Sequence, residues 1–232
     1  MSPAFKNSTP TQEVASGLPK DFVIVIGRQF GSGGRTIGKL IAGKLGIAYY
    51  DTELLNKAAS RLGVCTKIFK DQDEKKPSAL HTFLQGAYGI ADNFHSVPLT
   101  GERIYSAQSR VIKDVCSKGP CVIVGRNADF VMRNHPFLLS VFLHSPLQIR
   151  AKHIIDRGEA ANEKEACELA RQHDKRREAF YNFYTGDKRW GVADNYHVSL
   201  DTSGLEADGV ADIIISLAKQ KFNNHVSSSL NA

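Results

Sequence analysis

The chain has 232 residues, of which 42% are hydrophobic, and it carries a formal net charge of +6 at pH 7. This size and apolar content suit one sizeable α/β domain, alone or with a small mobile insert, and argue against two large domains. No apolar run is long enough to span a membrane, and residues 1–20 lack the apolar segment of a signal peptide. We therefore expect a cytoplasmic protein with flexible tails at residues 1–20 and 223–232.

The surplus of positive charge has two explanations. Basic proteins often bind nucleic acid. Here, however, the basic residues are spread along the chain and often stand beside acidic ones. A protein that handles polyanionic nucleotides also needs surplus Arg and Lys, and we favour this second explanation.

The cysteines give no sign of a metal site. They form no CxxC pair, and no His/Cys cluster has the spacing of metal ligands. We interpret them as reduced core cysteines of a cytosolic protein. They are Cys65, Cys116, Cys121 and Cys167.

Apolar runs that alternate with helical patterns predict the fold class. The expected strands are residues 22–27, 47–51, 121–125, 138–144 and 197–202. The expected helices are residues 36–45, 102–118, 146–157, 164–180 and 205–221. Strands that alternate with helices favour a parallel sheet covered on both faces, which is an α/β fold.

Two stretches do not fit this alternation. Residues 66–101 are long and polar in their first half, and we expect them to form helices outside the sheet. Residues 157–195 are dense in charge and then in aromatic residues and glycine. Insertions of this kind often act as lids over an active site.

A glycine cluster between the first expected strand and the first expected helix has the context of a P-loop. In the pattern G-x-x-x-x-G-K-[ST], backbone N–H groups cradle phosphates, the Lys reaches the β/γ oxygens, and the hydroxyl holds Mg²⁺. Two positions depart from it: Arg28 stands at the first glycine and Gly34 at the lysine. Because the cradle is made of backbone, we expect Gly31, Ser32 and Gly33 still to bind phosphate together with Gly34.

The lost lysine raises the question of which group replaces its charge. Arg35 is the nearest candidate, since a guanidinium is long and binds phosphate in a bidentate manner. Thr36 opens the helix, where the helix dipole favours an anion, and supplies the hydroxyl for Mg²⁺. The alternative is that the glycines form only a tight turn and that Arg35 is a solvated residue.

The segments RQFGSGGRT (28–36) and YYDTE (49–53) resemble the cytidylate kinase-like family, a branch of the nucleoside monophosphate kinases. The glycine-glycine-arginine form is similar to a divergent branch of that family. The resemblance extends over residues 22–219 and is weakest at residues 53–101.

This resemblance implies a three-layer P-loop kinase-like fold in a single domain over residues 21–222. The sheet would have five parallel strands in the order 2-3-1-4-5. A helical acceptor-binding region at about 52–101 and a lid at about 157–195 would complete the domain.

The resemblance also implies residues that bind the acceptor. Thr52 matches a Ser/Thr that helps to hold the acceptor nucleotide, and Asp51 precedes it at the carboxyl end of a strand, where open α/β sheets bind ligands. The alternative for both is a helix cap. Arg126 matches the family's Gly-Arg-Asp, with Asn127 in place of the Asp, and would pair with the acceptor phosphate. The alternative for Arg126 is an internal salt bridge.

The lid and the segment that leads into it are expected to carry catalytic arginines. Arg150, His153 and Arg157 lie on one helical face by spacing, and Asp174 and Arg177 match the charged exit of the family's lid. Such arginines place positive charge around the equatorial phosphoryl oxygens once the lid closes. The alternative is a solvated charged helix with internal Glu/Arg pairs.

The aromatic residues of 180–196 could stack on a base or pack the root of the lid, and we favour packing. Taken together, the sequence predicts ATP- and Mg²⁺-dependent phosphoryl transfer to a nucleoside monophosphate, with CMP or dCMP as first candidates. The expected partners are a nucleotide donor and a small-molecule acceptor, with no membrane and no nucleic acid. A kinase of another small acceptor and a non-catalytic nucleotide-binding module are the alternatives.

Overall fold

The computed structural model describes residues 18–61, 101–186 and 188–229. Within them, five parallel strands form one sheet in the order β2-β3-β1-β4-β5, which confirms the expected fold class and strand order. The strands are β1 (Val23–Arg28), β2 (Ala48–Tyr50), β3 (Cys121–Val124), β4 (Leu138–His144) and β5 (Val198–Asp201).

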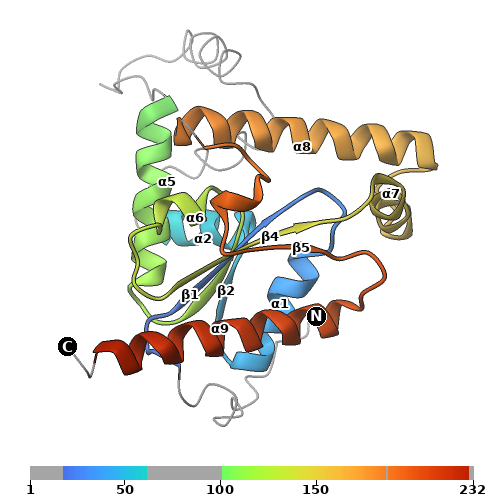
Figure 1. Ribbon diagram of the computed structural model, residues 1–232. Helices are drawn as coiled ribbons and strands as arrows, with labels where there is room; N and C mark the ends of the chain where they lie inside the picture. Colours follow the sequence, from blue (N-terminus) through green and yellow to red (C-terminus); the bar gives the residue numbers. More distant parts are fainter. Residues whose placement is uncertain (1–17, 62–100, 187, 230–232) are drawn as a thin grey trace, which may run out of the picture.

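Helices cover both faces of the sheet, as Figure 1 shows: α1 and α9 lie on one face, and α2, α5 and α6 lie on the other. The helices α7 and α8 lie beyond the carboxyl ends of the central strands. The helices are α1 (Gly34–Leu45), α2 (Thr52–Arg61), α5 (Gly101–Cys116), α6 (Ala128–Val131), α7 (Leu147–Asp156), α8 (Glu163–Thr185) and α9 (Ala207–Ser229), with a short 3₁₀ helix, η1 (Ala193–Asn195).

The alternation of side chains along β1 divides the core into two clusters. Ile24 and Ile26 pack toward α1 and α9, whereas Val23 and Val25 pack toward α2 and α5. All four side chains are fully buried, because successive residues of a strand point to opposite faces and both faces are covered. The end of β1 is therefore held rigidly, and the loop that follows it starts from a fixed position.

The C-terminal boundary differs from the expectation. The segment 223–232 was expected to be a tail, but α9 continues to Ser229. Asn and Ser are weak helix formers, but extending an existing helix avoids the costly nucleation step. At the other end, residues 1–17 lie outside the described part, while Leu18 packs against the core.

Part of the expected organisation is not described by the structure. The helices expected at residues 66–101, and most of the acceptor-binding region at 52–101, lie outside the described residues, and so does Cys65. Within the described part, Cys116 and Cys121 are buried free thiols with their sulfur atoms 3.8 Å apart.

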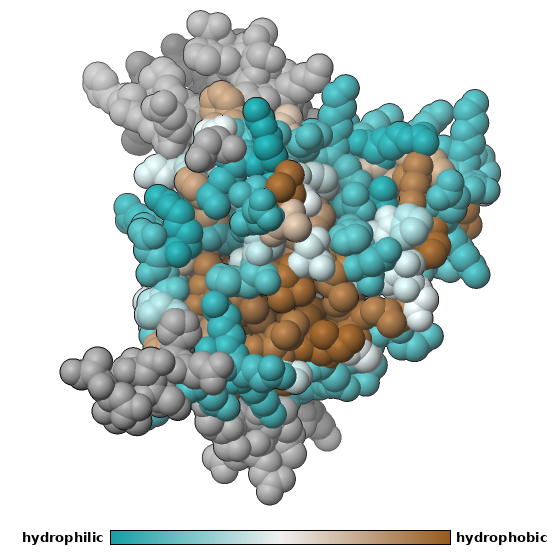
Figure 2. All heavy atoms as spheres, viewed as in Figure 1, coloured by the Kyte–Doolittle hydropathy of each residue, from teal (hydrophilic) through white to brown (hydrophobic). Residues whose placement is uncertain are grey.

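The surface of the viewed face is uneven. Figure 2 shows hydrophilic atoms along α8 and hydrophobic atoms in the middle of the face. The few buried residues of α8 include Ala166 and Ala170, which pack against α7. In the described part of the chain, no helix has the length and apolar character needed to cross a membrane.

Candidate active site

The loop between β1 and α1 presents a cradle of backbone donors. Within the described residues, the N–H groups of Gly33, Gly34, Arg35 and Thr36 have no hydrogen-bond acceptor. The N-cap of α1 is Gly33, which has no side chain that could accept from them. Unsatisfied N–H groups at the start of a helix attract anions, because the helix dipole adds a partial positive charge there. The backbone geometry is therefore that of a phosphate-binding loop.

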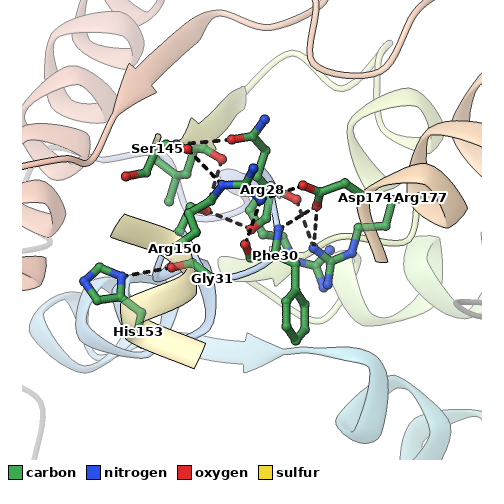
Figure 3. Close-up of polar contacts among 11 residues, drawn as sticks. Arg28, Phe30, Gly31, Ser145, Arg150, His153, Asp174 and Arg177 are labelled. Atoms are coloured by element: carbon green, nitrogen blue, oxygen red, sulfur yellow. Dashed lines mark hydrogen bonds and ion pairs between the residues drawn. The ribbon is translucent and has the colours of Figure 1, made fainter. Parts of the chain in front are cut away.

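Two side chains from α7 and α8 clamp the backbone of this loop. Arg150 donates from Nη1 to the carbonyl oxygen of Phe30 at 3.0 Å, and the N–H of Phe30 donates to Asp174 Oδ1 at 2.7 Å. Figure 3 shows the arginine and the carboxylate on either side of Phe30, joined by an ion pair of 2.6 Å. Burial raises the pKa of Asp174, although the Phe30 N–H and the nearby arginines oppose the rise.

The neighbouring residues of the two helices also face the loop. His153 Nδ1 lies 3.0 Å from the carbonyl oxygen of Gly31, and Arg177 donates to the carbonyl oxygen of Arg28 at 3.2 Å. Gly31 has a φ of 86°, and a Cβ there would lie 2.8 Å from the backbone oxygen of Arg150, so only glycine fits against α7. The face of α7 that was expected to be functional does meet the loop.

The other side of the loop is fixed to the sheet. The Ser32 hydroxyl shares its one hydrogen between the carbonyl oxygens of Gln29, at 2.9 Å, and of Leu143, at 3.1 Å. The Thr202 hydroxyl, beyond the end of β5, donates to the carbonyl oxygen of Ser32 at 3.3 Å. Ser32 thus contributes to the cradle by holding its shape, and its side chain is committed to backbone.

Arg28 has a position that the sequence analysis did not recognise as functional. Its side chain crosses from the end of β1 over Gly34: a Cβ on that glycine would lie 2.8 Å from Arg28 Cγ. Its guanidinium lies against Gly125, where a Cβ would overlap Nη1 and lie 2.8 Å from Cζ. The signal in the sequence was an arginine that ends a buried strand at the first glycine position of the loop.

Arg126 and Thr52, both expected to bind the acceptor, meet in the structure. Arg126 Nε donates to the Thr52 hydroxyl oxygen at 3.2 Å. The arginine is 6% exposed, with φ 64°, between Gly125 at φ 80° and Asn127 at φ 53°. Left-handed conformations cost non-glycine residues on the order of 1–3 kcal/mol each and concentrate at functional sites. Among the described residues, no group pairs with the buried Nδ2 of Asn127.

A pocket opens beside these residues, between the ends of β1 and β3 and the C-terminal half of α8. Three arginines from different elements contribute to its lining, together with one carboxyl group and four aromatic side chains. They are Arg28, Arg126, Arg177, Asp129, Phe180, Tyr181, Trp190 and Tyr196, which line the pocket together with Gly27, Gly125 and Asn127.

The carboxyl group in this pocket has an unusual environment. Asp129 is 9% exposed, and burial raises its pKa to about 6 even though the Tyr181 hydroxyl donates to Oδ2 at 2.9 Å. Burial also raises the pKa of Tyr181, so the phenol remains a donor at neutral pH. The pocket therefore combines fixed positive charge with a carboxyl that titrates close to neutrality.

The aromatic segment serves mainly as packing, as favoured from the sequence. Tyr184 stacks on Tyr105 of α5 with ring centroids 4.3 Å apart, and Trp190 meets Phe142 of β4 edge to face at 5.2 Å. Trp190 also lines the pocket, so part of the segment has both roles.

Comparison with known proteins identifies the family. A sequence model of the cytidylate kinase-like family matches residues 23–204, which form most of the chain. The chain belongs to the cytidylate kinase-like family. No curated protein shows significant similarity to it.

Several solved structures resemble this member of the cytidylate kinase-like family. An uncharacterized protein from Eubacterium ventriosum is 27% identical with a TM-score of 0.65, over 87% of this chain and 99% of that chain. A gluconokinase from Sinorhizobium meliloti is 16% identical with a TM-score of 0.49, over 90% and 98%. A shikimate kinase from Bacteroides thetaiotaomicron is 14% identical with a TM-score of 0.47, over 86% and 97%.

The remaining predicted residues of this cytidylate kinase-like chain take less specific positions. Asp51 caps α2, since its Oδ1 accepts from the N–H groups of Glu53 at 3.1 Å and Leu54 at 3.1 Å. Arg157 is exposed and pairs with Glu159 at 3.0 Å. Arg35 and Thr36 are exposed on the first turn of α1.

The buried carboxyl of Asp129 makes the stability of the protein depend on pH. The ordinary pKa of an aspartate is about 3.9, and in the folded protein burial raises it to about 6. The folded state thus binds this proton more tightly than the unfolded state. The group therefore destabilises the fold progressively as the pH rises from about 4 to about 6, by on the order of 2–3 kcal/mol.

We expect Asp129→Asn to gain stability relative to wild type over that range, because an amide cannot ionise but still accepts the Tyr181 hydroxyl. Urea unfolding of both proteins at several pH values between about 4 and about 7 measures the gain. If the difference in the free energy of unfolding between the two proteins stays constant over this pH range, the pKa of Asp129 is not raised.

Proposed function

We propose that the protein transfers the γ-phosphoryl group of ATP to a small anionic acceptor, with CMP and dCMP as first candidates. One observation carries this proposal: the cradle of open N–H groups at residues 33–36 lies beside a pocket lined by Arg28, Arg126 and Arg177. The cradle suits the phosphates of the donor, and the arginines suit the phosphate of the acceptor. Catalysis of phosphoryl transfer depends chiefly on the positioning of donor and acceptor and on positive charge around the transferred group, and this arrangement provides both.

The residues present also suit Mg²⁺ as the accompanying ion. Thr36 exposes its hydroxyl on the first turn of α1, beside the cradle, as the Mg²⁺-binding residue of a P-loop does. In the part of the chain that the structure describes, no cluster of three or more His, Cys, Asp or Glu side chains forms a metal site. Mg²⁺ bound to a nucleotide needs few protein ligands, because phosphate oxygens and waters complete its shell. Thr36 would therefore hold the ion, which would neutralise charge on the donor phosphates.

The lid residues support the proposal in a different way. Arg177 lies where it borders both the loop and the pocket, which suits a cation that acts on the transferred group. Arg150 and Asp174 are engaged with the backbone of Phe30, so we propose that they act by positioning the loop. A catalytic role for Arg157 requires it to leave Glu159, which costs little at an exposed position.

A second acceptor class has specific support from Asp129. A hydroxyl acceptor loses a proton during transfer and gains from a nearby base, whereas the phosphate of a monophosphate does not need one. Asp129 lies in the same pocket as Arg126, and its pKa of about 6 leaves it ionised at neutral pH. Asp129→Asn separates the two classes: turnover on a hydroxyl acceptor should fall by about 10²–10⁴, and turnover on CMP should persist.

Nucleotide binding is the first expectation that follows. ATP with Mg²⁺ at about 100 times its dissociation constant should stabilise the protein by about 2.7 kcal/mol, which raises the melting temperature by roughly 5–10 °C for a domain of this size. Thermal unfolding with ATP, ADP and adenosine measures this effect, with adenosine as the control that lacks phosphates. No shift at millimolar nucleotide and Mg²⁺ contradicts the proposal.

A further inference from the structure

The place of the missing P-loop lysine is filled by another side chain. Gly34 holds the lysine position, and the first carbon of any side chain there would lie 2.8 Å from Cγ and 3.0 Å from Cβ of Arg28. The first distance is shorter than packed carbon atoms allow, and the second is tighter than most contacts between packed carbon atoms. The two departures from the P-loop pattern therefore belong together. The long side chain comes from Arg28 at the end of β1, and the glycine at the start of α1 leaves space for it.

The charged end of Arg28 lies in the pocket between the phosphate cradle and Arg126. Its guanidinium rests against Gly125, which precedes Arg126, so the side chain reaches from the phosphate cradle to the acceptor side of the pocket. The side chain is 9% exposed, and a charge in a site with little water acts more strongly than one on the surface. Its guanidinium offers a planar set of donors that matches phosphate oxygens.

We propose that Arg28 supplies the charge of the missing lysine by donating to the β/γ oxygens of ATP. This inference rests on the proposed function. In the transfer, the bond from the γ-phosphorus to its bridging oxygen breaks, a bond from the acceptor oxygen to that phosphorus forms, and ADP leaves with the electron pair. Negative charge grows on the bridging oxygen, and the guanidinium of Arg28 stabilises it.

Arg35 is the rival source of this charge. It follows Gly34 directly, but it is exposed on the first turn of α1. The pKa of Glu159, near the turn after α7, is lowered chiefly by its hydrogen bond with Arg157 and to a smaller extent by the charge of Arg35. Arg28, in contrast, contacts Gly34 itself and lines the pocket. The two arginines therefore form a matched pair, equal in charge and different in location.

The test compares Arg28→Gln, Arg35→Gln and the exchange R28G/G34K, which restores the first glycine and the lysine of the usual P-loop pattern. Calorimetric titration with ATP and with ADP, both with Mg²⁺, gives the ratio of the two affinities. Arg28→Gln should lower the preference for ATP about tenfold or more, the value of one charged hydrogen bond, and Arg35→Gln should leave it unchanged. R28G/G34K should recover most of the preference, even if Arg28→Gln folds poorly.

Four results overturn the inference. If Arg28→Gln prefers ATP over ADP as strongly as wild type does, Arg28 does not have this role, although the proposed function stands. The same conclusion follows if the preference is lost in Arg35→Gln instead. A folded R28G/G34K that does not recover the preference shows that Arg28 acts only by filling space. Failure of the wild-type protein to bind ATP at all removes the proposed function together with this inference.

Discussion

Arg126→Ala is expected to weaken the binding of CMP on the order of 10²-fold or more, while ATP binding stays nearly intact. A charge-assisted bidentate contact with a phosphate has a value of this size. Arg126 is buried in the pocket and donates to Thr52, and the cradle is made of backbone N–H groups of residues 33–36, so we expect the loss of this side chain to leave the cradle unchanged. Calorimetric titration of each ligand measures the two effects separately.

Arg133→Ala is the matched control for this variant. It removes the same charge from the same segment, but Arg133 is exposed and lies over the ring of Phe130, with 4.1 Å between Cζ and the ring centroid. We expect the control to bind CMP like wild type. If Arg126→Ala loses ATP affinity as far as CMP affinity, the assignment of Arg126 to the acceptor is wrong.

Arg150→Ala is expected to lower the free energy of unfolding by about 3–5 kcal/mol, the usual cost of breaking a buried ion pair by removing one partner. The change leaves Asp174 buried without its closest cation and removes the donor to the Phe30 carbonyl. The side chains of the pair are only 8% and 14% exposed, so water compensates little. Urea unfolding measures the loss.

Two controls distinguish this effect from a general loss of charge. Arg157→Ala changes the residue that directly follows α7. It removes an exposed pair with Glu159 and a guanidinium 5.8 Å from the centre of the Phe30 ring, and should cost less than about 1 kcal/mol. The double variant R150A/D174A should recover part of the loss, since it removes the unpaired carboxylate. A cost of Arg150→Ala as small as that of Arg157→Ala contradicts the role of the clamp.

The fold was largely predictable because its signals are local. Residues 138–144 form a mostly apolar run of strand length, and β4 has the same bounds. The first expected helix began at Thr36, whereas α1 begins at Gly34, because a glycine-capped start carries no sequence signal of the usual kind. The order of the strands followed from the family resemblance, since periodicity alone does not fix which strands are neighbours.

The sequence offered candidate residues for the site but did not predict the contacts that they make. Spacing placed Arg150 and His153 on one face of α7, and that face does meet the loop. It did not show that Arg150 is used by the backbone of Phe30, because that contact joins residues 120 positions apart. The sequence showed Arg28 and Gly34 only as two departures from the P-loop pattern. It did not show that the two residues touch, because that contact depends on the path of the loop between β1 and α1.

Transfer of the γ-phosphoryl group itself is the most direct test of this account. Wild-type protein is incubated with Mg²⁺ and ATP that carries a radioactive γ-phosphate, together with CMP, dCMP, the other monophosphates or small hydroxyl acceptors, and the products are separated. The account predicts that the label moves to a monophosphate, with CMP and dCMP the first candidates, or, if Asp129 acts as a base, to a hydroxyl acceptor. Label that stays on ATP with every acceptor, although ATP binds, contradicts it and identifies the protein as a binding module.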